Sequence, residues 1–290
     1  MNSLTLPSYA KINLGLNILG KREDGFHEIE TILQQIDLRD EIELSPREGP
    51  EVAFRCDQVC VPGGENNLCV RAATMLKAET GVRKGIAIHL NKRIPMGAGL
   101  GGGSSNAAMV LLGLNKLWQL NLRPPQLTSL ASRLGSDVPF FIQGGTALAV
   151  GKGDVLVPGA VLENHVVLVV YPGFEISTSW AYGQINLNLT ISKKNIKLRN
   201  LMGKKIDCKI LRELANDFEV FVFKRFPVLA SIKERLLASN ATLASLSGSG
   251  STVYGVFQNE HEALEAQEVY KNKYTTFITR PIKWGYCQMS

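Results

Sequence analysis

Residues 95–106 read Pro-Met-Gly-Ala-Gly-Leu-Gly-Gly-Gly-Ser-Ser-Asn, with glycine at five of the seven positions from Gly97 to Gly103. Glycine adopts positive φ and carries no Cβ, so such a loop lets backbone N–H groups converge on an anion. The apolar run that follows predicts a helix, which Ser104 or Ser105 would cap and whose dipole would face the same anion. The stretch therefore predicts phosphate binding.

Three familiar glycine patterns fail to explain this loop. Gly97, Gly99 and Gly102 match the dinucleotide fingerprint, which needs an acidic residue about 20 positions further on. No Asp or Glu occurs between residues 97 and 136. A Walker loop ends in Lys-Ser or Lys-Thr, and a protein-kinase loop leads into a strand with Ala-x-Lys, and neither is present here. A turn without a ligand is the remaining alternative, and five glycines cost too much chain entropy for an ordinary turn.

Composition indicates a soluble globular chain of two domains, with 290 residues, 45% hydrophobic and 20% charged. No apolar run approaches the roughly 18 residues of a membrane span, and the N-terminus lacks a signal pattern, so we expect a cytoplasmic protein without a membrane partner. The five cysteines include no Cys-x-x-Cys and are expected to be reduced. Nothing in the sequence predicts an oligomeric state.

The net charge of +6 comes from one segment, since residues 192–212 hold eight Lys or Arg against one Asp. A solvated surface is the favoured interpretation, and steering of an anionic substrate is the alternative. No aromatic residues interleave with these cations, which argues against a nucleic-acid partner.

The pattern of elements predicts an α+β fold in two lobes, residues 1–158 and 159–290. Apolar periodicity and flanking Gly and Pro residues predict helices at 68–79, before Gly81, and at 126–134, before Gly135. A buried strand is expected at 166–170, and a second glycine-serine turn at 246–256. Asn216 and Glu219 form a predicted capping pair before a helix that Pro227 breaks.

Polar residues near the N-terminus offer candidate chemistry. Residues 9–18 alternate as in a half-buried strand, which places Lys11 and Asn13 on one face roughly 7 Å apart. An ordinary solvent face is the alternative interpretation. Asp137 is the first carboxylate after the glycine loop, and on its own it would be read as a turn residue. Phosphoryl transfer needs a cation and a group that orients or deprotonates the acceptor, and Lys11 and Asp137 are the candidates.

Several blocks resemble the motifs of the GHMP small-molecule kinases, and the resemblance spans nearly the whole chain. They are Ala10-Lys-Ile-Asn-Leu, Asp24-Gly-Phe-His, residues 95–108, Gly135-Ser-Asp-Val-Pro, Asn216-Asp217 and residues 246–255. The resemblance implies a two-lobed GHMP kinase fold with the active site in the cleft. Its N-terminal lobe would be like ribosomal protein S5, and its C-terminal lobe like an α/β-plait.

Within that family the first blocks resemble the branch that acts on a cytidine-diphosphate substrate. The implied reaction is ATP-dependent phosphorylation of the 2-hydroxyl of 4-diphosphocytidyl-2-C-methyl-D-erythritol, in the non-mevalonate isoprenoid pathway. ATP is the implied cosubstrate, with Mg²⁺ expected. A GHMP kinase for another alcohol, such as a mevalonate-type substrate, and a non-catalytic nucleotide-binding protein on the same fold are the alternatives.

The resemblance also implies roles for individual residues. Asp137 would orient or deprotonate the acceptor hydroxyl, and Lys11 would stabilise the transferring charge. The cytidine end would be held by Asn13, Phe26, His27, Thr178 and Tyr182, with the cytosine between Phe26 and Tyr182. ATP would be bound by Asn67, Leu68, Pro95, Met96, Gly97, Ala98, Gly99, Leu100, Gly101, Gly102, Gly103, Ser104 and Ser105. No metal ligand is predicted. Phe26 and Asp154 stand where the family usually carries Tyr and Glu.

Overall fold

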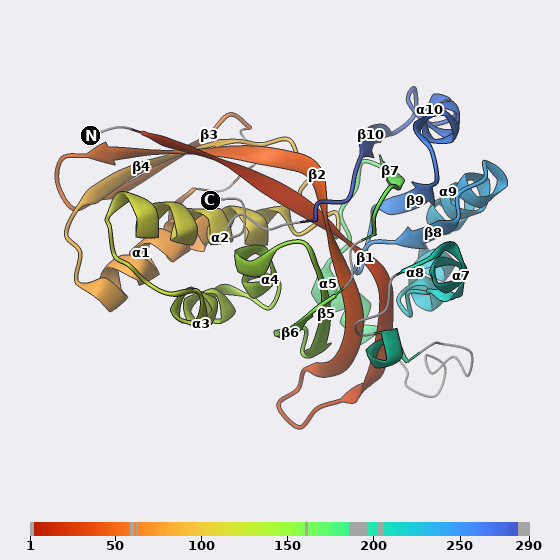
Figure 1. Cartoon of the computed structure of the whole chain (residues 1–290), viewed down its shortest axis with the longest axis horizontal. Helices are drawn as coiled ribbons and strands as arrows, with labels where there is room; N and C mark the ends of the chain where they lie inside the picture. Colours follow the sequence, from red (N-terminus) through yellow and green to blue (C-terminus); the bar gives the residue numbers. More distant parts are fainter. Residues whose placement is uncertain are drawn as a thin grey trace.

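The computed structural model describes residues 3–58, 61, 63–159, 162–185, 197–201 and 206–283, and these form two β-sheets with helices packed on them (Figure 1). The first sheet has six strands in the order β3-β4-β2-β5-β6, with β1 paired to β2. Its strands are β1 (Leu4–Lys21), β2 (His27–Arg47), β3 (Val52–Cys56), β4 (Gly85–Asn91), β5 (Thr146–Gly151) and β6 (Val155–Pro158).

The second sheet has four strands in the order β10-β7-β9-β8. They are β7 (Val166–Tyr171), β8 (Leu243–Leu246), β9 (Val253–Phe257) and β10 (Thr275–Thr279). The first lobe contains η1 (Gly64–Asn66), α1 (Leu68–Thr80), α2 (Gly102–Leu117), α3 (Pro124–Leu134) and α4 (Val138–Gln143). The second contains α5 (Thr178–Gly183), η2 (Leu198–Leu201), α7 (Cys208–Glu213), α8 (Glu219–Arg225), α9 (Pro227–Ala238) and α10 (Glu260–Glu268).

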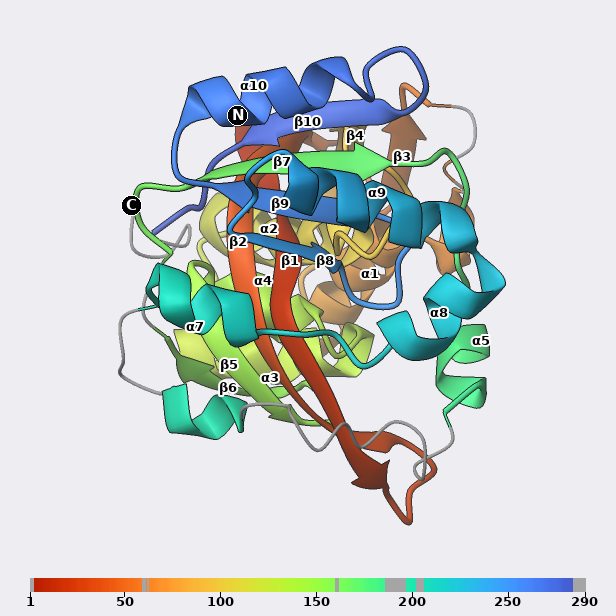
Figure 2. The same ribbon diagram turned by 90° about the vertical axis from the view of Figure 1, so that its right-hand side faces the viewer.

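The predicted strand at 166–170 is confirmed as β7, and packing explains its unbroken apolar run. Val167 and Val169 belong to the core shared with β1 and β2. Leu168 and Val170 point the other way, into the core formed with α9 and α10. Figure 2 shows these helices on the outer side of the second sheet. A strand buried on both faces has no polar side, so it shows no alternation.

The strand at 9–18 is confirmed within β1, but the prediction of a half-buried strand is wrong. Lys11, Asn13 and Asn17 are buried, as are the apolar residues between them. The apolar side of β1 packs against the second sheet. The polar side is covered because the Lys11 N–H donates to the Leu100 carbonyl oxygen at 2.9 Å and the glycine loop lies across it.

Both predicted helices of the first lobe are confirmed, as α1 ending before Gly81 in the left-handed region and α3 ending before Gly135. The predicted serine cap of the helix after the glycine loop is wrong. The N-cap of α2 is Gly101, at φ 68°, without a side-chain capping bond. The Ser105 hydroxyl instead accepts a hydrogen bond from Ser8 at 2.8 Å.

The predicted capping pair of Asn216 and Glu219 is also wrong. The Asn216 side chain does accept from the Phe218 N–H, at 3.0 Å. Glu219 turns away and accepts from the Leu246 N–H at 3.0 Å, which ties α8 to β8. The break at Pro227 is confirmed, because α8 ends at Arg225 and α9 begins at Pro227. The glycine-serine turn at 246–256 is confirmed as the link between β8 and β9.

The boundary between the two lobes is predicted at 158/159 and stays a prediction. In the structure, β6 of the first sheet ends at Pro158 and β7 of the second sheet begins at Val166. Cys56, Cys69 and Cys208 are free thiols, and the other two cysteines lie outside the described residues. Much of the basic segment 192–212 also lies outside them. Within the described part of the chain no helix is long and apolar enough to cross a membrane.

Gly113 tests how closely α2 packs on the first sheet. A Cβ at this position would meet the Leu44 side chain and would lie 2.6 Å from Leu6 Cδ1, inside the core. We expect Gly113→Ala to lower the free energy of unfolding by about 1–2 kcal/mol, since overpacking outweighs the gain in helix propensity. Thermal or urea unfolding measures it. Gly20→Ala is the control, because a Cβ there meets nothing within 4 Å. A Gly113→Ala protein more stable than the wild type would contradict this packing.

Candidate active site

A cavity of about 1080 Å³ lies between the two lobes. Its walls come from β1, the turn between β1 and β2, the glycine loop, the start of α4, α5 and the turn between β8 and β9. The following residues predicted for the site line this cavity: Lys11, Asn13, Phe26, His27, Asn67, Leu68, Pro95 to Ser104, Asp137, Thr178 and Tyr182. Of the predicted residues, Ser105 is outside it.

Lys11 and Asp137 come together although 126 positions separate them in the sequence. The Lys11 Nζ atom lies 3.6 Å from Asp137 Oδ2. The Asp137 side chain is 40% exposed, and it lines the cavity. Lys11 is buried and donates to Asn13 Oδ1 at 2.6 Å. Asn13 in turn donates to the Thr31 hydroxyl at 2.8 Å. This chain of hydrogen bonds fixes the ammonium group beside a carboxylate that a ligand can reach.

The glycine loop depends on close approach as well as on positive φ. Gly97, Gly99 and Gly101 have φ values of 56°, 76° and 68°. A Cβ on Gly99 would collide with the Ser247 carbonyl oxygen, and one on Gly101 would lie 3.0 Å from Lys11 Cγ. Only glycine allows the loop to lie between the lysine on β1 and the turn of the second lobe.

The turn between β8 and β9 fastens the loop from the other side. The Ser247 hydroxyl donates to the Gly99 carbonyl oxygen at 2.8 Å. Asn216 donates to the carbonyl oxygens of Leu246 and Gly248, at 2.8 and 2.9 Å. A Cβ on Gly248 would lie 3.5 Å from Lys11 Nζ, so this turn also borders the catalytic candidate. Sequence reasoning assigned Asn216 to a helix cap and missed this anchoring role.

A buried ionic network behind the loop was not predicted. Asp40 accepts from Lys92 Nζ at 2.6 Å and from the Arg93 and Ile94 N–H groups, both at 2.7 Å. Asn106 donates to Asp40 at 2.9 Å and to the Ser8 hydroxyl at 2.8 Å. The network therefore holds both ends of the loop, where it leaves β4 and where it enters α2. Asp40 stands among other charged residues of β2, so no sequence signal singled it out.

Ser105, predicted to bind ATP, belongs to this network and does not line the cavity. Its hydroxyl faces Ser8, and its N–H donates to the Gly101 carbonyl oxygen at 2.9 Å as part of the helix. The residue is completely buried. Neither polar group of Ser105 faces the cavity, whereas Ser104 lines it.

Aromatic side chains gather at the other end of the cavity. The His27 and Tyr182 rings stack with centroids 5.0 Å apart and an interplanar angle of 22°. Tyr182 meets Phe218 edge to face, with centroids also 5.0 Å apart. Phe26 is 54% exposed at the rim. The Thr178 and Ser249 hydroxyls lie 3.2 Å apart across the cavity wall. This end offers flat apolar faces and a few hydroxyls.

Two pKa shifts characterise this aromatic end. Burial, with a smaller contribution from the charge of Lys21, lowers the pKa of His27 below its ordinary value. Burial, with a smaller contribution from Asp137, raises the pKa of Tyr182 to about 12. Both groups are therefore neutral at pH 7, and both keep a hydrogen-bond donor. The imidazole also keeps one acceptor nitrogen.

The charges that line the cavity favour anionic ligands. Four lysines line the cavity, Lys11, Lys21, Lys92 and Lys152, of which Lys92 is paired with Asp40 and Lys152 with Asp154. Clefts lined by one sign of charge concentrate counter-charged ligands. The site therefore combines the glycine loop, a lysine–aspartate pair and an aromatic subsite in one cleft.

Comparison with known proteins identifies the family to which the chain belongs. The GHMP kinases N terminal domain matches residues 67–145, and the GHMP kinases C terminal domain matches residues 201–276. A crystal structure of homoserine kinase from Cytophaga hutchinsonii superposes with a TM-score of 0.76 at 18% identity, covering 98% of this chain and 96% of the other. The chain belongs to the GHMP kinases, the class of ATP-dependent phosphotransferases that this fold and site define.

Relatives of higher sequence identity show which branch of the GHMP kinases the chain belongs to. The 4-diphosphocytidyl-2-C-methyl-D-erythritol kinase of Pelodictyon phaeoclathratiforme is 43% identical, with 99% of each chain covered. That of Alkaliphilus metalliredigens is 39% identical over 98% of this chain and 99% of its own. A crystal structure of 4-(cytidine 5'-diphospho)-2C-methyl-D-erythritol kinase superposes with a TM-score of 0.81 at 32% identity, covering 95% and 98%. Within the GHMP kinases, the chain is a member of this kinase family.

Gly99 provides the test of the loop geometry. A methyl group there would strain a positive φ and push the loop off the Ser247 carbonyl. We expect Gly99→Ala to weaken ATP binding by about tenfold or more, measured as loss of the ATP-induced rise in melting temperature. Gly135→Ala is the control, since a Cβ there makes only a 3.6 Å contact with Val138. Unchanged ATP stabilisation of Gly99→Ala would contradict the assignment.

Proposed function

We propose that this chain transfers the γ-phosphoryl group of ATP to the 2-hydroxyl of 4-diphosphocytidyl-2-C-methyl-D-erythritol. The observation that carries the proposal is the Lys11–Asp137 pair, 3.6 Å apart between the glycine loop and the aromatic end of one cleft. The names of relatives about 40% identical over nearly the full length support the substrate. The reaction would belong to the non-mevalonate isoprenoid pathway, and its need for ATP favours a cytoplasmic location.

The chemistry follows from the positions of the two side chains. Asp137 orients the acceptor hydroxyl and takes its proton as the oxygen–phosphorus bond forms. The bond between the γ-phosphorus and the bridging oxygen breaks, and ADP leaves with that oxygen. Lys11, held by Asn13 at 2.6 Å, places its side-chain nitrogen beside the equatorial oxygens of the transferring group. Positioning and electrostatic stabilisation of this kind account for most of phosphoryl-transfer catalysis.

The ATP end of the cleft is built around the start of α2. N–H groups of the loop from Gly97 to Gly103 and of Ser104 would bind the phosphates, because α2 presents its positive end there. Asn67 and Leu68, where α1 begins, would border the adenine. Asn67 is fixed by capping that helix, since its Oδ1 accepts from the Cys69 N–H at 2.8 Å.

Magnesium is expected to arrive with ATP and to neutralise charge on its β- and γ-phosphates. Within the described residues there is no group of three or more His, Cys, Asp or Glu side chains that could hold a metal ion. Magnesium bound to a nucleotide needs only one or two protein oxygens. Ser104, in the first turn of α2, lines the cleft and would supply such an oxygen.

The cytidine end would use the aromatic residues. Phe26 and Tyr182 offer faces for the cytosine, and neutral His27 can both donate to and accept from its polar edge. In this structure the His27 ring covers one face of Tyr182. A base that stacks on that face therefore requires the His27 ring to turn aside, which would bring its nitrogens to the edge of the base.

The two alternatives make different demands. A mevalonate-type substrate has no base, so it would leave the His27 and Tyr182 subsite unused. A crystal structure of mevalonate kinase superposes with a TM-score of 0.74 at 17% identity, a likeness of fold alone. A non-catalytic nucleotide-binding protein would have no need of the Lys11–Asp137 pair. Turnover of the cytidine substrate compared with mevalonate separates these possibilities.

Asp137→Asn tests the catalytic assignment. The amide cannot accept the proton, so kcat should fall by about 100-fold or more, while both Michaelis constants change little. ADP release in a coupled assay measures it. Asp57→Asn is the matched control, because Asp57 is an exposed carboxylate beside His89 and does not line the cleft. Near wild-type kcat in Asp137→Asn would remove Asp137 from the mechanism.

The titration of His27 should make the Michaelis constant for the cytidine substrate depend on pH. Its lowered pKa means that protonation occurs only below the ordinary value of about 6.5. The Michaelis constant for the cytidine substrate should be flat from pH 8 to about 6.5 and rise at lower pH, as the imidazole loses its acceptor. His27→Gln should have a raised constant without this rise. The same acid limb in His27→Gln would show that another group titrates.

A further inference from the structure

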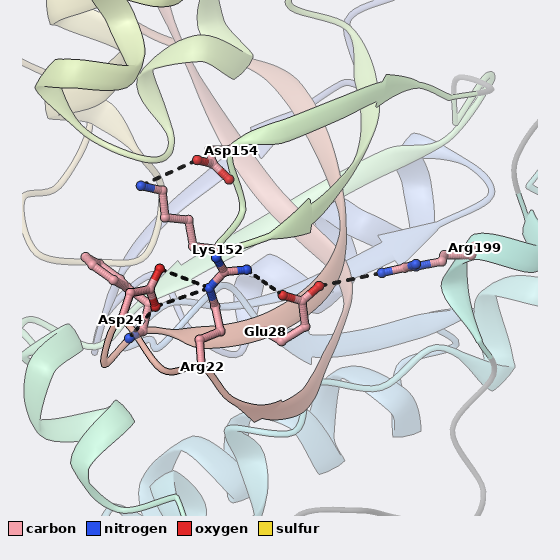
Figure 3. Close-up of polar contacts among 7 residues, drawn as sticks. Arg22, Asp24, Glu28, Lys152, Asp154 and Arg199 are labelled. Carbon is pink, nitrogen blue, oxygen red and sulfur yellow. Dashed lines mark hydrogen bonds and ion pairs between the residues drawn. The ribbon is translucent and has the colours of Figure 1, made fainter.

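The turn that carries Phe26 and His27 is held together largely by Arg22 (Figure 3). The Arg22 N–H donates to the Phe26 carbonyl oxygen at 2.8 Å, and the Gly25 N–H donates to the Arg22 carbonyl oxygen at 3.2 Å. The guanidinium Nε contacts Asp24 Oδ1 and Oδ2 at 3.2 and 3.1 Å. Its Nη1 donates to Glu28 Oε2 at 2.9 Å. One side chain thus bridges the two sides of the turn.

Asp24, which Arg22 contacts, also restrains the backbone of Phe26. Its Oδ1 accepts from the Phe26 N–H at 3.2 Å. Desolvation is the largest single influence and acts to raise the pKa of Asp24, but the hydrogen bond from the Phe26 N–H and the contacts of Arg22 together outweigh it, so the pKa is lowered. The carboxylate therefore stays ionised at neutral pH and keeps both contacts.

A second cation reaches Phe26 from the turn between β5 and β6. The Lys152 Nζ atom lies 5.3 Å from the centroid of the Phe26 ring, a distance suited to a cation–π contact. It also lies 3.6 Å from Asp154 Oδ2. Gly151 and Gly153, with φ of 73° and 93°, allow the tight turn that presents this lysine. Lys152 and Phe26 both line the cleft.

The second lobe joins the same cluster through Arg199. Its side chain lies 2.5 Å from Glu30, which is buried, and 3.7 Å from Glu28. Glu28 is therefore held between Arg22 and Arg199, as Figure 3 shows. The cluster thus connects the turn to the body of the molecule.

Packing alone does not fix the turn. Phe26 is 54% exposed, and the hairpin of β1 and β2 projects from the body in both views (Figures 1 and 2). Ion pairs as exposed as these add little to global stability. Their effect is local, since they restrict the orientations of an aromatic ring that is more than half exposed.

We propose that Arg22 and Lys152 are positioning residues that hold Phe26 in place for stacking on the cytosine. Arg22 acts through Asp24 on the backbone of Phe26, and Lys152 acts on the ring itself. This inference rests on the proposed function, because it assigns the cluster to the cytidine end of that substrate.

A double-mutant cycle tests the proposal, with Michaelis constants for both substrates, kcat and melting temperature measured for each protein. Arg22→Ala should raise the constant for the cytidine substrate about 5-fold, as expected for lost charge-assisted hydrogen bonds at an exposed site. Lys152→Ala should raise it about 3-fold, the usual size of an exposed cation–π contact. The constant for ATP, kcat and the melting temperature should stay close to wild type.

The decisive comparison uses double variants, in which Arg22→Ala or Lys152→Ala is combined with Phe26→Ala. If Arg22 and Lys152 act through the ring, neither substitution should raise the constant further once the ring is gone. Lys152→Arg, which keeps a cation, should stay close to wild type. Arg280→Ala is the control, because Arg280 makes a similarly exposed ion pair with Glu260, 2.7 Å long and remote from the turn.

Three results would overturn the inference. They are unchanged constants in the single variants, equal rises for ATP and the cytidine substrate, and effects that multiply fully in the Phe26→Ala background. The last result would mean that the cations contact the substrate directly. Wild-type protein that fails to turn over the cytidine substrate would overturn the proposed function, and the inference with it.

Discussion

The close approach of three chain segments at Gly99 and Gly101 is the constraint on which the rest of the site depends. At these positions the loop passes between Lys11 on β1 and the Ser247 carbonyl of the second lobe, with no room for a side chain. The loop at Gly99 and Gly101 thus joins the two lobes and covers the polar side of β1. It also places the start of α2 beside Lys11. The same loop that we propose to bind phosphate through its N–H groups also covers Lys11, the cation that the loop itself lacks.

Buried polar groups keep this arrangement in register. Asp40 receives four hydrogen bonds, from Lys92, Arg93, Ile94 and Asn106, and so fixes both ends of the loop. Asn216 fixes the opposing turn through two carbonyl oxygens. Because an unpaired polar group in a core is costly, such fully bonded networks specify one geometry. The proposed catalytic pair, Lys11 and Asp137, therefore rests on rigid elements, while the hairpin end of the cleft is held by exposed ion pairs.

Local sequence patterns predicted much of the fold but not its tertiary contacts. The helices before Gly81 and Gly135, the strand at 166–170 and the break at Pro227 follow from periodicity and backbone chemistry, and the structure confirms them. The burial of Lys11 could not be predicted, since the covering loop lies about 90 positions away, and Asn13 is covered by the still more distant turn at Gly248. The same limit applies to Ser105, whose partner Ser8 lies 97 positions distant. The serine cap failed because Gly101 already provides the left-handed turn into α2. The pairing of Lys11 with Asp137 came from chemical need and resemblance, whereas Asp40 carried no signal that separated it from its charged neighbours.

A crystal structure with a non-hydrolysable ATP analogue and 4-diphosphocytidyl-2-C-methyl-D-erythritol tests the central claim most directly. The account predicts the 2-hydroxyl about 3 Å from the Asp137 carboxylate, in line with the γ-phosphorus. The γ-phosphate should contact Lys11 and the N–H groups at the start of α2. A 2-hydroxyl held by other residues, or phosphates bound away from the glycine loop, would contradict it.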